Sequence, residues 1–524
     1  MKKILILLST VVLFLASCDK DFQEINTNPQ QVKSTNPGLL FSNALLGTPS
    51  TNWQGESTII QQFVLPYNQG VTLGYQFNEN VDGINGGPWN TFTGSLKNLE
   101  HILPDLKGDA TRSNFYNLAR IWRAYCYMWL VDHYGDVPYA EAGKAASTGT
   151  FYPVYEKDEA IYADIEKELK EATAALDAAK DNTSKYDIFI ASTSTVAQEV
   201  TFWKRLGYSL LLRLGMRYSK LDATKAKSIV QAAFTGGVMQ SNNDNVYIKY
   251  KTSTGAAITG YNNGAASGIR TTSYFYYVAK PLVDTLKFLS DPRLKYIAAN
   301  YNPFQSTVAN ITNPDTIMAN QFGFPVGYSD ATISTSSDYR PPSGGSTGQN
   351  YSQVNCNVFG SPQTPQIILT YAQTSLLLAE AAQSGWLTGL TGAKTAKEYY
   401  EAGVRASMDS YTILPGTAPI PLSLQDAYLT MPGVAFTAGN ELKVINMQYW
   451  IECFSNGYEG WCNFRRTGIP ALKGNTWNSN LAGGFIRRFG YPLREQSANP
   501  TNYTAAVASL GGPDNLTTRI FWDK

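Results

Sequence analysis

The chain has 524 residues, and its hydrophobic fraction of 43% indicates a globular protein with one large core or several smaller ones. Its formal net charge of +1 argues against a nucleic-acid partner, because binding to phosphates requires a basic surface. Charged residues make up only 16% and aromatic residues 13%, a balance that suits neutral, hydroxylated ligands as well as it suits a secreted protein from a saline habitat.

The N-terminus has the pattern of a bacterial lipoprotein signal. Lys2 and Lys3 precede an apolar run at 4–15, and small residues then lead to Cys18. The run is too short to span a membrane in the mature protein and is typical of a cleaved signal. We therefore expect a signal peptide at 1–17 and lipidation of Cys18, whose acyl chains would anchor the mature chain. The alternative is an ordinary secretory signal with an accidental cysteine.

Residues 109–133 are expected to form the central helix of the fold. Apolar residues recur there every three or four positions and also occupy the opposite side, so the helix should be buried nearly all round. Arg120 and Arg123 lie in its middle, and buried arginines usually need carboxylate partners. Gly135 can adopt the left-handed backbone conformation that ends a helix, and Pro138 prevents continuation of the helix.

Other amphipathic segments are predicted to pair into helical hairpins that resemble tetratricopeptide repeats. Such a hairpin cannot bury its apolar face alone and must stack on its neighbours. The expected fold class is therefore all-α, with tetratricopeptide-like helical hairpins forming a superhelical scaffold, a loop-rich lobe and little β-structure. The hairpins expected are 109–133 with 157–179, 200–219 with 223–234, and 366–384 with 394–409, and further helices are expected at 39–46, 89–103, 280–290 and 441–466.

Residues 240–365 form a loop-rich insert, dense in Asn, Ser, Thr, Gly, Pro and Tyr. A long segment with so few helical signals is usually functional or disordered in a compact protein. Its tyrosines favour an ordered segment. We expect the rest of 18–524 to be one helical ligand-binding domain around it.

The sequence carries no clear catalytic or metal-binding motif. His101 and His133 belong to no metal-binding pattern and are expected at the surface or in turns. A match to GxSxG at 344–348 follows two prolines rather than a strand, so it does not predict a nucleophile elbow. We therefore expect no catalytic residue, no metal site and no cofactor.

Glu380 is the only charge on an otherwise apolar predicted helix. It could be a catalytic acid, but we favour a buried ion pair with Arg123 or Arg405. Cys453 and Cys462 could form a disulfide in an oxidising compartment, and their spacing leaves this open.

A set of motifs is spread over nearly the whole chain, namely Cys18, Asn-Thr-Asn-Pro at 26–29, Tyr-Gly-Asp-Val-Pro at 134–138, Leu-Leu-Ala-Glu-Ala at 377–381 and Arg-Arg-Thr-Gly at 465–468. Together they resemble the SusD/RagB family of Bacteroidetes outer-membrane lipoproteins. The resemblance is closest to the starch-binding-associated SusD-like branch. It implies a non-catalytic protein of the outer membrane that faces the exterior, covers a SusC-like TonB-dependent transporter, and delivers to it an oligosaccharide or, in some branches, a peptide.

The resemblance does not identify the residues that contact the ligand, so they are chosen by their chemistry. Sugar rings present C–H faces that pack on aromatic rings, and their hydroxyls need polar partners such as Asn or Arg. Oligosaccharide binding is the function expected, with peptide capture by the same architecture and a surface glycosidase as alternatives. The candidates are loop aromatics and their polar neighbours, namely Trp53, Tyr75, Trp89 with Asn90, Tyr274, Tyr328, and Tyr339 with Arg340.

Overall fold

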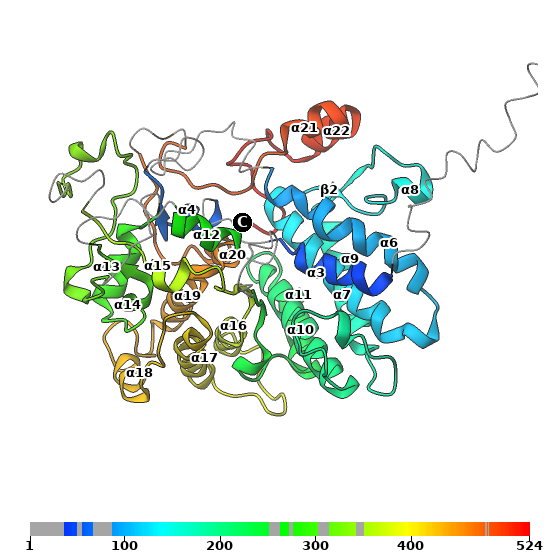
Figure 1. Cartoon of the computed structure of the whole chain (residues 1–524), viewed down its shortest axis with the longest axis horizontal. Helices are drawn as coiled ribbons and strands as arrows, with labels where there is room; N and C mark the ends of the chain where they lie inside the picture. Colours follow the sequence, from blue (N-terminus) through cyan, green and yellow to red (C-terminus); the bar gives the residue numbers. More distant parts are fainter. Residues whose placement is uncertain are drawn as a thin grey trace, which may run out of the picture.

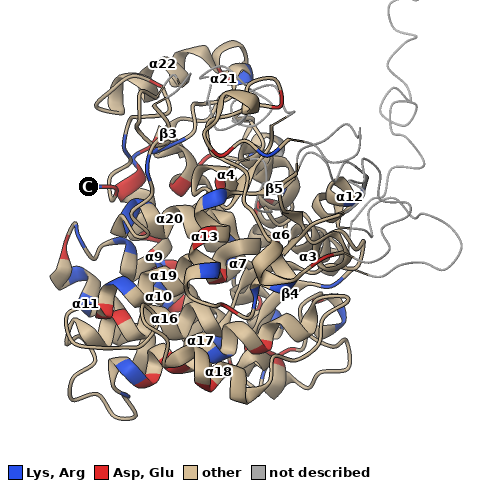
Figure 2. Cartoon of the chain, turned by 90° about the vertical axis from the view of Figure 1, so that its left-hand side faces the viewer, with Lys and Arg blue, Asp and Glu red and all other residues tan. Residues whose placement is uncertain are grey.

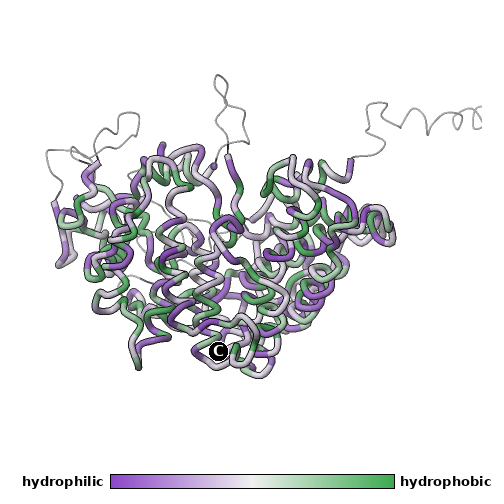
Figure 3. The backbone as a smooth tube through the Cα atoms, turned by 90° about the horizontal axis from the view of Figure 1, so that it is seen from below, coloured by the Kyte–Doolittle hydropathy of each residue, from purple (hydrophilic) through white to green (hydrophobic). Residues whose placement is uncertain are grey.

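The computed structural model describes residues 36–49, 55–66, 86–250, 263–271, 276–301, 314–341, 350–476, 479 and 481–524. In these ranges the fold is predominantly helical, with short strands (Figure 1). The predicted signal peptide at 1–17 and Cys18 lie outside them. None of the described helices combines the length and apolar character needed to cross a bilayer. Along the chain, hydrophilic and hydrophobic residues alternate over short distances (Figure 3).

The predicted central helix is α7 (Ser113–Tyr134), and it lies in the core. It begins a few residues later than predicted, because Asp109 caps a short 3-10 turn, η3 (Ala110–Arg112), through the backbone N–H of Thr111. Gly135 ends the helix with a φ of +79°, as expected. The prediction that its buried arginines need carboxylate partners is confirmed, since Arg120 pairs with Glu168 and Arg123 with Glu100.

The predicted helical hairpins are present and are stacked side by side. In chain order they are α7 with α9 (Asp158–Ala174), α10 (Val196–Arg217) with α11 (Ala223–Gly236), and α16 (Tyr371–Gln383) with α17 (Ala396–Ser410). A further pair that was not predicted consists of α19 (Glu441–Glu452) and α20 (Gly457–Thr467). Helix α10 packs against both α9 and α16, and α16 packs against α19, so each hairpin covers the apolar face of the next. The prediction of a tetratricopeptide-like helical scaffold is confirmed.

Two of the predicted helices are interrupted. The segment 366–384 begins as a strand, β8 (Gln366–Leu369), which pairs with β4 (Val246–Ile248), and Thr370 then caps α16. The β-branched residues of this segment suit a strand, and the helical period begins only after the cap.

The segment 441–466 is also interrupted, since η11 (Cys453–Ser455) separates α19 from α20. The break lets α4 (Glu56–Ile59) approach the start of α20. A Cβ added at Gly457 would lie 2.2 Å from the Ser57 Oγ, so this approach requires a glycine.

A small sheet organises what we call the lobe, residues 276–301, 314–341 and 350–354. The strands are antiparallel, in the order β1 (Phe63–Val64), β5 (Tyr277–Val278), β7 (Gln353–Val354) and β6 (Ala298–Ala299). Each strand is only a pair of residues, in line with the prediction of little β-structure. The lobe also contains the predicted helix at 280–290, observed as α13 (Lys280–Phe288).

The remaining elements connect or cover these parts. The predicted helix at 89–103 is instead a 3-10 turn, a π-helical turn and then α6, which extends to Leu106. The elements are α3 (Pro37–Leu46), η1 (Pro88–Asn90), η2 (Phe92–Leu96), α6 (Lys97–Leu106), β2 (Val137–Pro138), α8 (Ala145–Thr148), β3 (Tyr155–Glu156), η4 (Ser184–Tyr186), η5 (Asn242–Asp244), α12 (Gly264–Thr271), α14 (Leu294–Ile297), η8 (Met318–Asn320), η9 (Ile333–Thr335), α15 (Cys356–Phe359), η10 (Tyr411–Ile413), α18 (Leu422–Leu429), α21 (Leu493–Ala498) and α22 (Pro500–Ser509).

A buried charge cluster joins α10 to α20. Arg217 and Arg213 lie 2.6 and 3.2 Å from the Glu459 carboxylate, and all of these side chains are fully enclosed. Burial alone would raise the pKa of Glu459, but the guanidinium groups of Arg213 and Arg217 outweigh it and lower that pKa to about 2. The cluster therefore holds an ionised carboxylate inside the scaffold.

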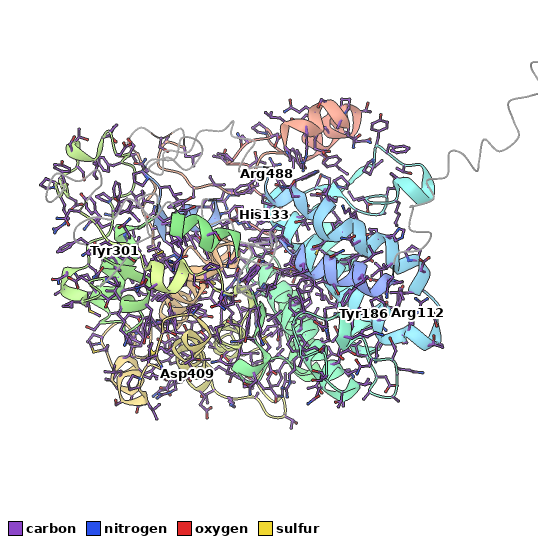
Figure 4. The ribbon with its side chains drawn as sticks, in the orientation of Figure 1. Arg112, His133, Tyr186, Tyr301, Asp409 and Arg488 are labelled. Carbon is purple, nitrogen blue, oxygen red and sulfur yellow. The ribbon has the colours of Figure 1, made fainter. Side chains whose placement is uncertain are left out.

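The expectation that His133 lies at the surface or in a turn is wrong. His133 is fully buried near the middle of the molecule (Figure 4). Its Nε2 lies 2.7 Å from Glu56 Oε1 and its Nδ1 lies 2.7 Å from the carbonyl oxygen of Trp129. Both ring nitrogens thus have hydrogen-bond partners, which makes burial of the polar ring possible.

The described cysteines are buried free thiols. Cys453 and Cys462 therefore do not form the disulfide that their sequence left open. Burial raises the pKa of Cys453 well above its usual value, which keeps this thiol protonated and unreactive.

Candidate ligand-binding site

The structure separates the candidate residues into two groups. Trp89 and Asn90 lie in η1, next to the central helix. Tyr328, Tyr339 and Arg340 lie in the lobe. The other candidates, Trp53, Tyr75 and Tyr274, and the proposed lipidation site Cys18 are outside the described residues.

Trp89 is part of the core packing. Its side chain is 4% exposed, and its ring packs edge-on against Tyr134 and Tyr491 with centroid distances of 4.9 and 5.9 Å. The adjacent Asn90 is exposed, and its Oδ1 accepts a hydrogen bond of 3.2 Å from Arg494 Nη2. Asn90 is therefore the member of this pair that faces solvent.

The lobe has an aromatic core of its own that fixes its outer loops. Phe324 is fully buried and its ring centroid lies 5.0 Å from that of Tyr277 and 4.9 Å from that of Tyr351. The Tyr351 hydroxyl donates to the carbonyl oxygen of Asp338 at 2.7 Å and accepts from the backbone N–H of Arg340 at 3.0 Å. These bonds hold the backbone on both sides of Tyr339 to a rigid support.

Arg340 stacks on an aromatic ring at the surface of the lobe. Its Cζ lies 3.6 Å from the ring centroid of Phe322, and its Nε donates to the carbonyl oxygen of Asn350 at 3.0 Å. Lys287 lies over the same ring, with its Nζ 4.6 Å from the centroid. Cation–π contact and the hydrogen bond together set the orientation of the guanidinium group.

Phe322 and Tyr339 are the exposed aromatic residues of this site, at 36% and 37%. We call Phe322, Tyr339 and Arg340 the lobe platform. Phe322 was not among the predicted residues, because the sequence pattern sought Tyr or Trp beside Asn or Arg. Phe322 meets Arg340 only in the folded chain. Because Arg340 and Lys287 both lie over the Phe322 ring, the platform offers mainly the Tyr339 ring and guanidinium N–H donors, a combination that suits a ring-shaped, hydroxylated ligand.

Tyr328 belongs to the support of the site. It is half-buried and packs against the aromatic core of the lobe. Gly327 before it has a φ of +101°, and a Cβ there would lie 2.6 Å from Asn475 Oδ1. A close approach to the segment around Asn475 thus sets the position of Tyr328.

The charges around the platform are of both signs. Lys280 lies 2.8 Å from Asp284 and 3.8 Å from Asp338, and the hydrogen bond that Lys280 donates to Asp284 raises the pKa of Lys280. Figure 2 likewise shows positive and negative residues interspersed across this side of the molecule. The described residues contain no His, Cys, Asp and Glu cluster suited to a metal ion.

Glu380, the charge singled out in the sequence, forms the predicted buried ion pair with a different partner. It pairs with Arg466 of α20, while Arg405 pairs with Asp426 at 2.6 Å and Arg123 with Glu100. The named partners were wrong because the packing of α16 close to α20 is a tertiary feature that the sequence pattern does not contain.

Comparisons with known proteins agree with this architecture. The SusD-like_2 family model, described as "Starch-binding associating with outer membrane", matches residues 29–492. No curated protein sequence matches the chain.

Solved structures resemble the chain over almost its whole length. A structure named as a chitin-binding protein is 27% identical, with a TM-score of 0.76, over 93% of this chain and 100% of that one. A Bacteroidetes AC2a SusD-like protein is 26% identical, with a TM-score of 0.79, over 94% and 100%. A chitin-binding SusD homolog from Flavobacterium johnsoniae shares the fold at 22% identity, with a TM-score of 0.72, over 94% and 99%. Together with the family match over most of its length, these likenesses show that the chain belongs to the SusD-like family.

Proposed function

We propose that this protein is a surface-exposed lipoprotein of the outer membrane that binds an oligosaccharide and delivers it to a SusC-like TonB-dependent transporter for nutrient import. The observation that carries the proposal is the lobe platform, where the guanidinium of Arg340 stacks on the partly exposed ring of Phe322 and exposed Tyr339 precedes Arg340 in the chain, on a rigid support. Membership of a family described as starch-binding and associated with the outer membrane supports it.

The chemistry of the platform favours a sugar. The C–H face of a pyranose packs on an aromatic ring, and guanidinium N–H groups donate to the ring hydroxyls. Relatives of similar fold include proteins named as chitin-binding, which also points to a carbohydrate ligand. We therefore assign a binding role rather than a catalytic one.

The attachment to the membrane is part of the proposal. Cleavage after residue 17 would leave Cys18 as the lipidated first residue of a ligand-binding domain at 18–524. Several acyl chains on one cysteine suffice for firm anchoring, because each buried CH₂ contributes about 0.8 kcal/mol. Trp53, Tyr75 and Tyr274, which lie outside the described residues, remain proposed ligand contacts in addition to the platform.

Incubation of the purified protein with starch and chitin oligosaccharides, followed by calorimetry and chromatography, tests the function. We expect heat of binding and unchanged oligosaccharides. Shortened products would instead establish a glycosidase. Binding of peptides without binding of any oligosaccharide would establish peptide capture.

A further inference from the structure

Two adjoining cavities lie on the helical scaffold. The first, of about 800 Å³, lies between the end of α11, the start of α16 and the loop 389–394. The second, of about 450 Å³, lies against α17. Tyr371 and Gln240 line both cavities, so the two meet at these side chains. Asp409 of the second cavity lies at the bottom of Figure 4, whereas Tyr301 of the lobe lies at the upper left.

Each cavity has a buried polar atom that lacks a hydrogen-bond partner among the described residues. Ser375 is fully buried, lines the first cavity and leaves its Oγ without a partner. Arg405 lines the second cavity. Its Nη2 pairs with Asp426, but its buried Nη1 has no partner. Buried polar groups in folded proteins are nearly always hydrogen-bonded. We therefore expect a bound molecule to supply hydrogen-bond partners for the Ser375 Oγ and the Arg405 Nη1.

Glycines shape the rim of the first cavity. Gly389 and Gly392 have φ values of +82° and +80°, and a Cβ at either position would meet nothing within 4 Å. Gly237, on the opposite wall, has a φ of +99° and is equally unobstructed. The loop therefore turns through left-handed residues without placing side chains over the opening.

The lining combines an aromatic ring and hydroxyl and amide groups with two cations, Lys394 and Arg405, which suits a hydroxylated ring. Tyr371 is half-buried at the junction of the cavities and presents an aromatic surface. Hydroxyl and amide side chains surround it, including those of Thr235, Thr391 and Asn242. The one carboxylate, Asp409, already accepts a hydrogen bond of 2.7 Å from Gln425 Nε2. The two volumes lie in the range of small-molecule sites, roughly 300–1,000 Å³.

We propose that the two cavities form a second oligosaccharide-binding site on the helical scaffold, which we call the scaffold site. Tyr371 provides the stacking ring, Ser375 binds a sugar hydroxyl on one side, and Arg405 does so on the other. An extended peptide is disfavoured, because peptide grooves use a sheet edge or a row of apolar anchor pockets. The scaffold site goes beyond the proposed function of the lobe and does not depend on it.

Calorimetric titration with starch and chitin oligosaccharides tests the proposal on the wild type and on Tyr371→Ala, Tyr371→Phe and Ser375→Ala. We expect Tyr371→Ala to weaken binding at the scaffold site about tenfold, since the stacked ring is lost. Tyr371→Phe keeps the ring and should retain most of the affinity. Ser375→Ala should weaken binding severalfold without lowering the melting temperature, because its Oγ has no partner within the folded chain to lose.

Matched variants separate this site from the lobe. Tyr152→Ala removes a tyrosine that is 66% exposed elsewhere and should leave every titration unchanged. Tyr339→Ala should weaken binding at the lobe about tenfold and leave the affinity of the scaffold site unchanged, so each site can be measured even if the other does not bind. The proposal is overturned if Tyr371→Ala and Ser375→Ala titrate like the wild type while remaining folded by circular dichroism. It is also overturned if neither oligosaccharide binds a Tyr339→Ala protein, or if only a peptide does.

Discussion

Glu380 of α16 and Arg466 of α20 form a two-point ion pair deep in the scaffold. Arg466 Nη2 donates to Glu380 Oε2 at 2.7 Å, and Nη1 donates to Oε1. Arg466 Nη2 also donates to Asn463 Oδ1 at 2.7 Å. The two side chains are only 2% and 11% exposed, so the pair connects the hairpin of α16 to that of α20 with little access to water. Its role is to hold the scaffold together.

The first prediction concerns this pair. Glu380→Gln should lower the free energy of unfolding by about 3 kcal/mol, because it leaves the buried Arg466 without its charge partner. Affinity for oligosaccharide per folded molecule should not change. Thermal and urea denaturation measure the first quantity and calorimetry the second.

A matched control is the exposed pair of Lys397 and Glu401, 3.7 Å apart. Glu401→Gln should change stability by no more than about 0.5 kcal/mol, since solvent screens exposed ion pairs. A Glu380→Gln protein with normal melting but no ligand binding would show instead that Glu380 acts in the ligand site.

The second prediction is a pH dependence from Glu459. Its pKa in the folded protein is about 2, below the ordinary value of 4.5, so its stabilising effect is complete above pH 4.5 and is lost as the pH falls toward 2. A shift of this size corresponds to about 3 kcal/mol at neutral pH. The difference in unfolding free energy between the wild type and Glu459→Gln should therefore shrink steadily below pH 4.5. A difference that stays constant from pH 7 to pH 2 would contradict the ion cluster.

The third prediction separates packing from ligand contact among the aromatic candidates. Trp89→Ala should cost about 3–5 kcal/mol of stability, because it empties a volume enclosed by Tyr134 and Tyr491. Tyr339→Ala should change stability by about 0.5 kcal/mol or less, because its side chain is substantially exposed. Denaturation curves of both variants decide this, and equal losses of stability would show that Tyr339 is a packing residue too.

The fourth prediction concerns the anchor. Cells that express the full chain and are fed a labelled fatty acid should label the protein at Cys18, and Cys18→Ser should abolish the label and release the protein from the membrane fraction. Labelling of the Cys18→Ser variant, or its retention in that fraction, would refute lipidation at this position.

Local sequence patterns predicted the scaffold well, because the spacing of apolar residues indicates which face of a helix is buried. The central helix, the hairpins and the need of Arg120 for a carboxylate all follow from neighbours along the chain. The strand β8 was missed because its few residues continue the apolar pattern of the helix that follows.

Tertiary relationships were beyond the reach of the sequence. His133 is buried with a hydrogen-bond partner, Glu56, that comes from a distant segment of the chain. Glu380 forms its ion pair with Arg466 and not with Arg123 or Arg405, the partners predicted from the sequence. The same holds for Phe322, whose exposed ring became part of the candidate site through its contact with Arg340. Single residue types in loops indicate candidates, but the fold decides which of them meet.

The measurement that tests the central claim most directly is the affinity of the lobe platform for oligosaccharide. Calorimetry should compare the wild type with Tyr339→Ala and Phe322→Ala, and should repeat the comparison in the Tyr371→Ala background, where the weakened scaffold site contributes less to the measured binding. We predict that each variant lowers the affinity about tenfold while the melting temperature stays within a degree or so, because Tyr339→Ala removes an exposed ring proposed to contact the sugar and Phe322→Ala removes the ring that orients Arg340. Equal affinity in the wild type and both variants would contradict the assignment of this surface as the site that captures the ligand.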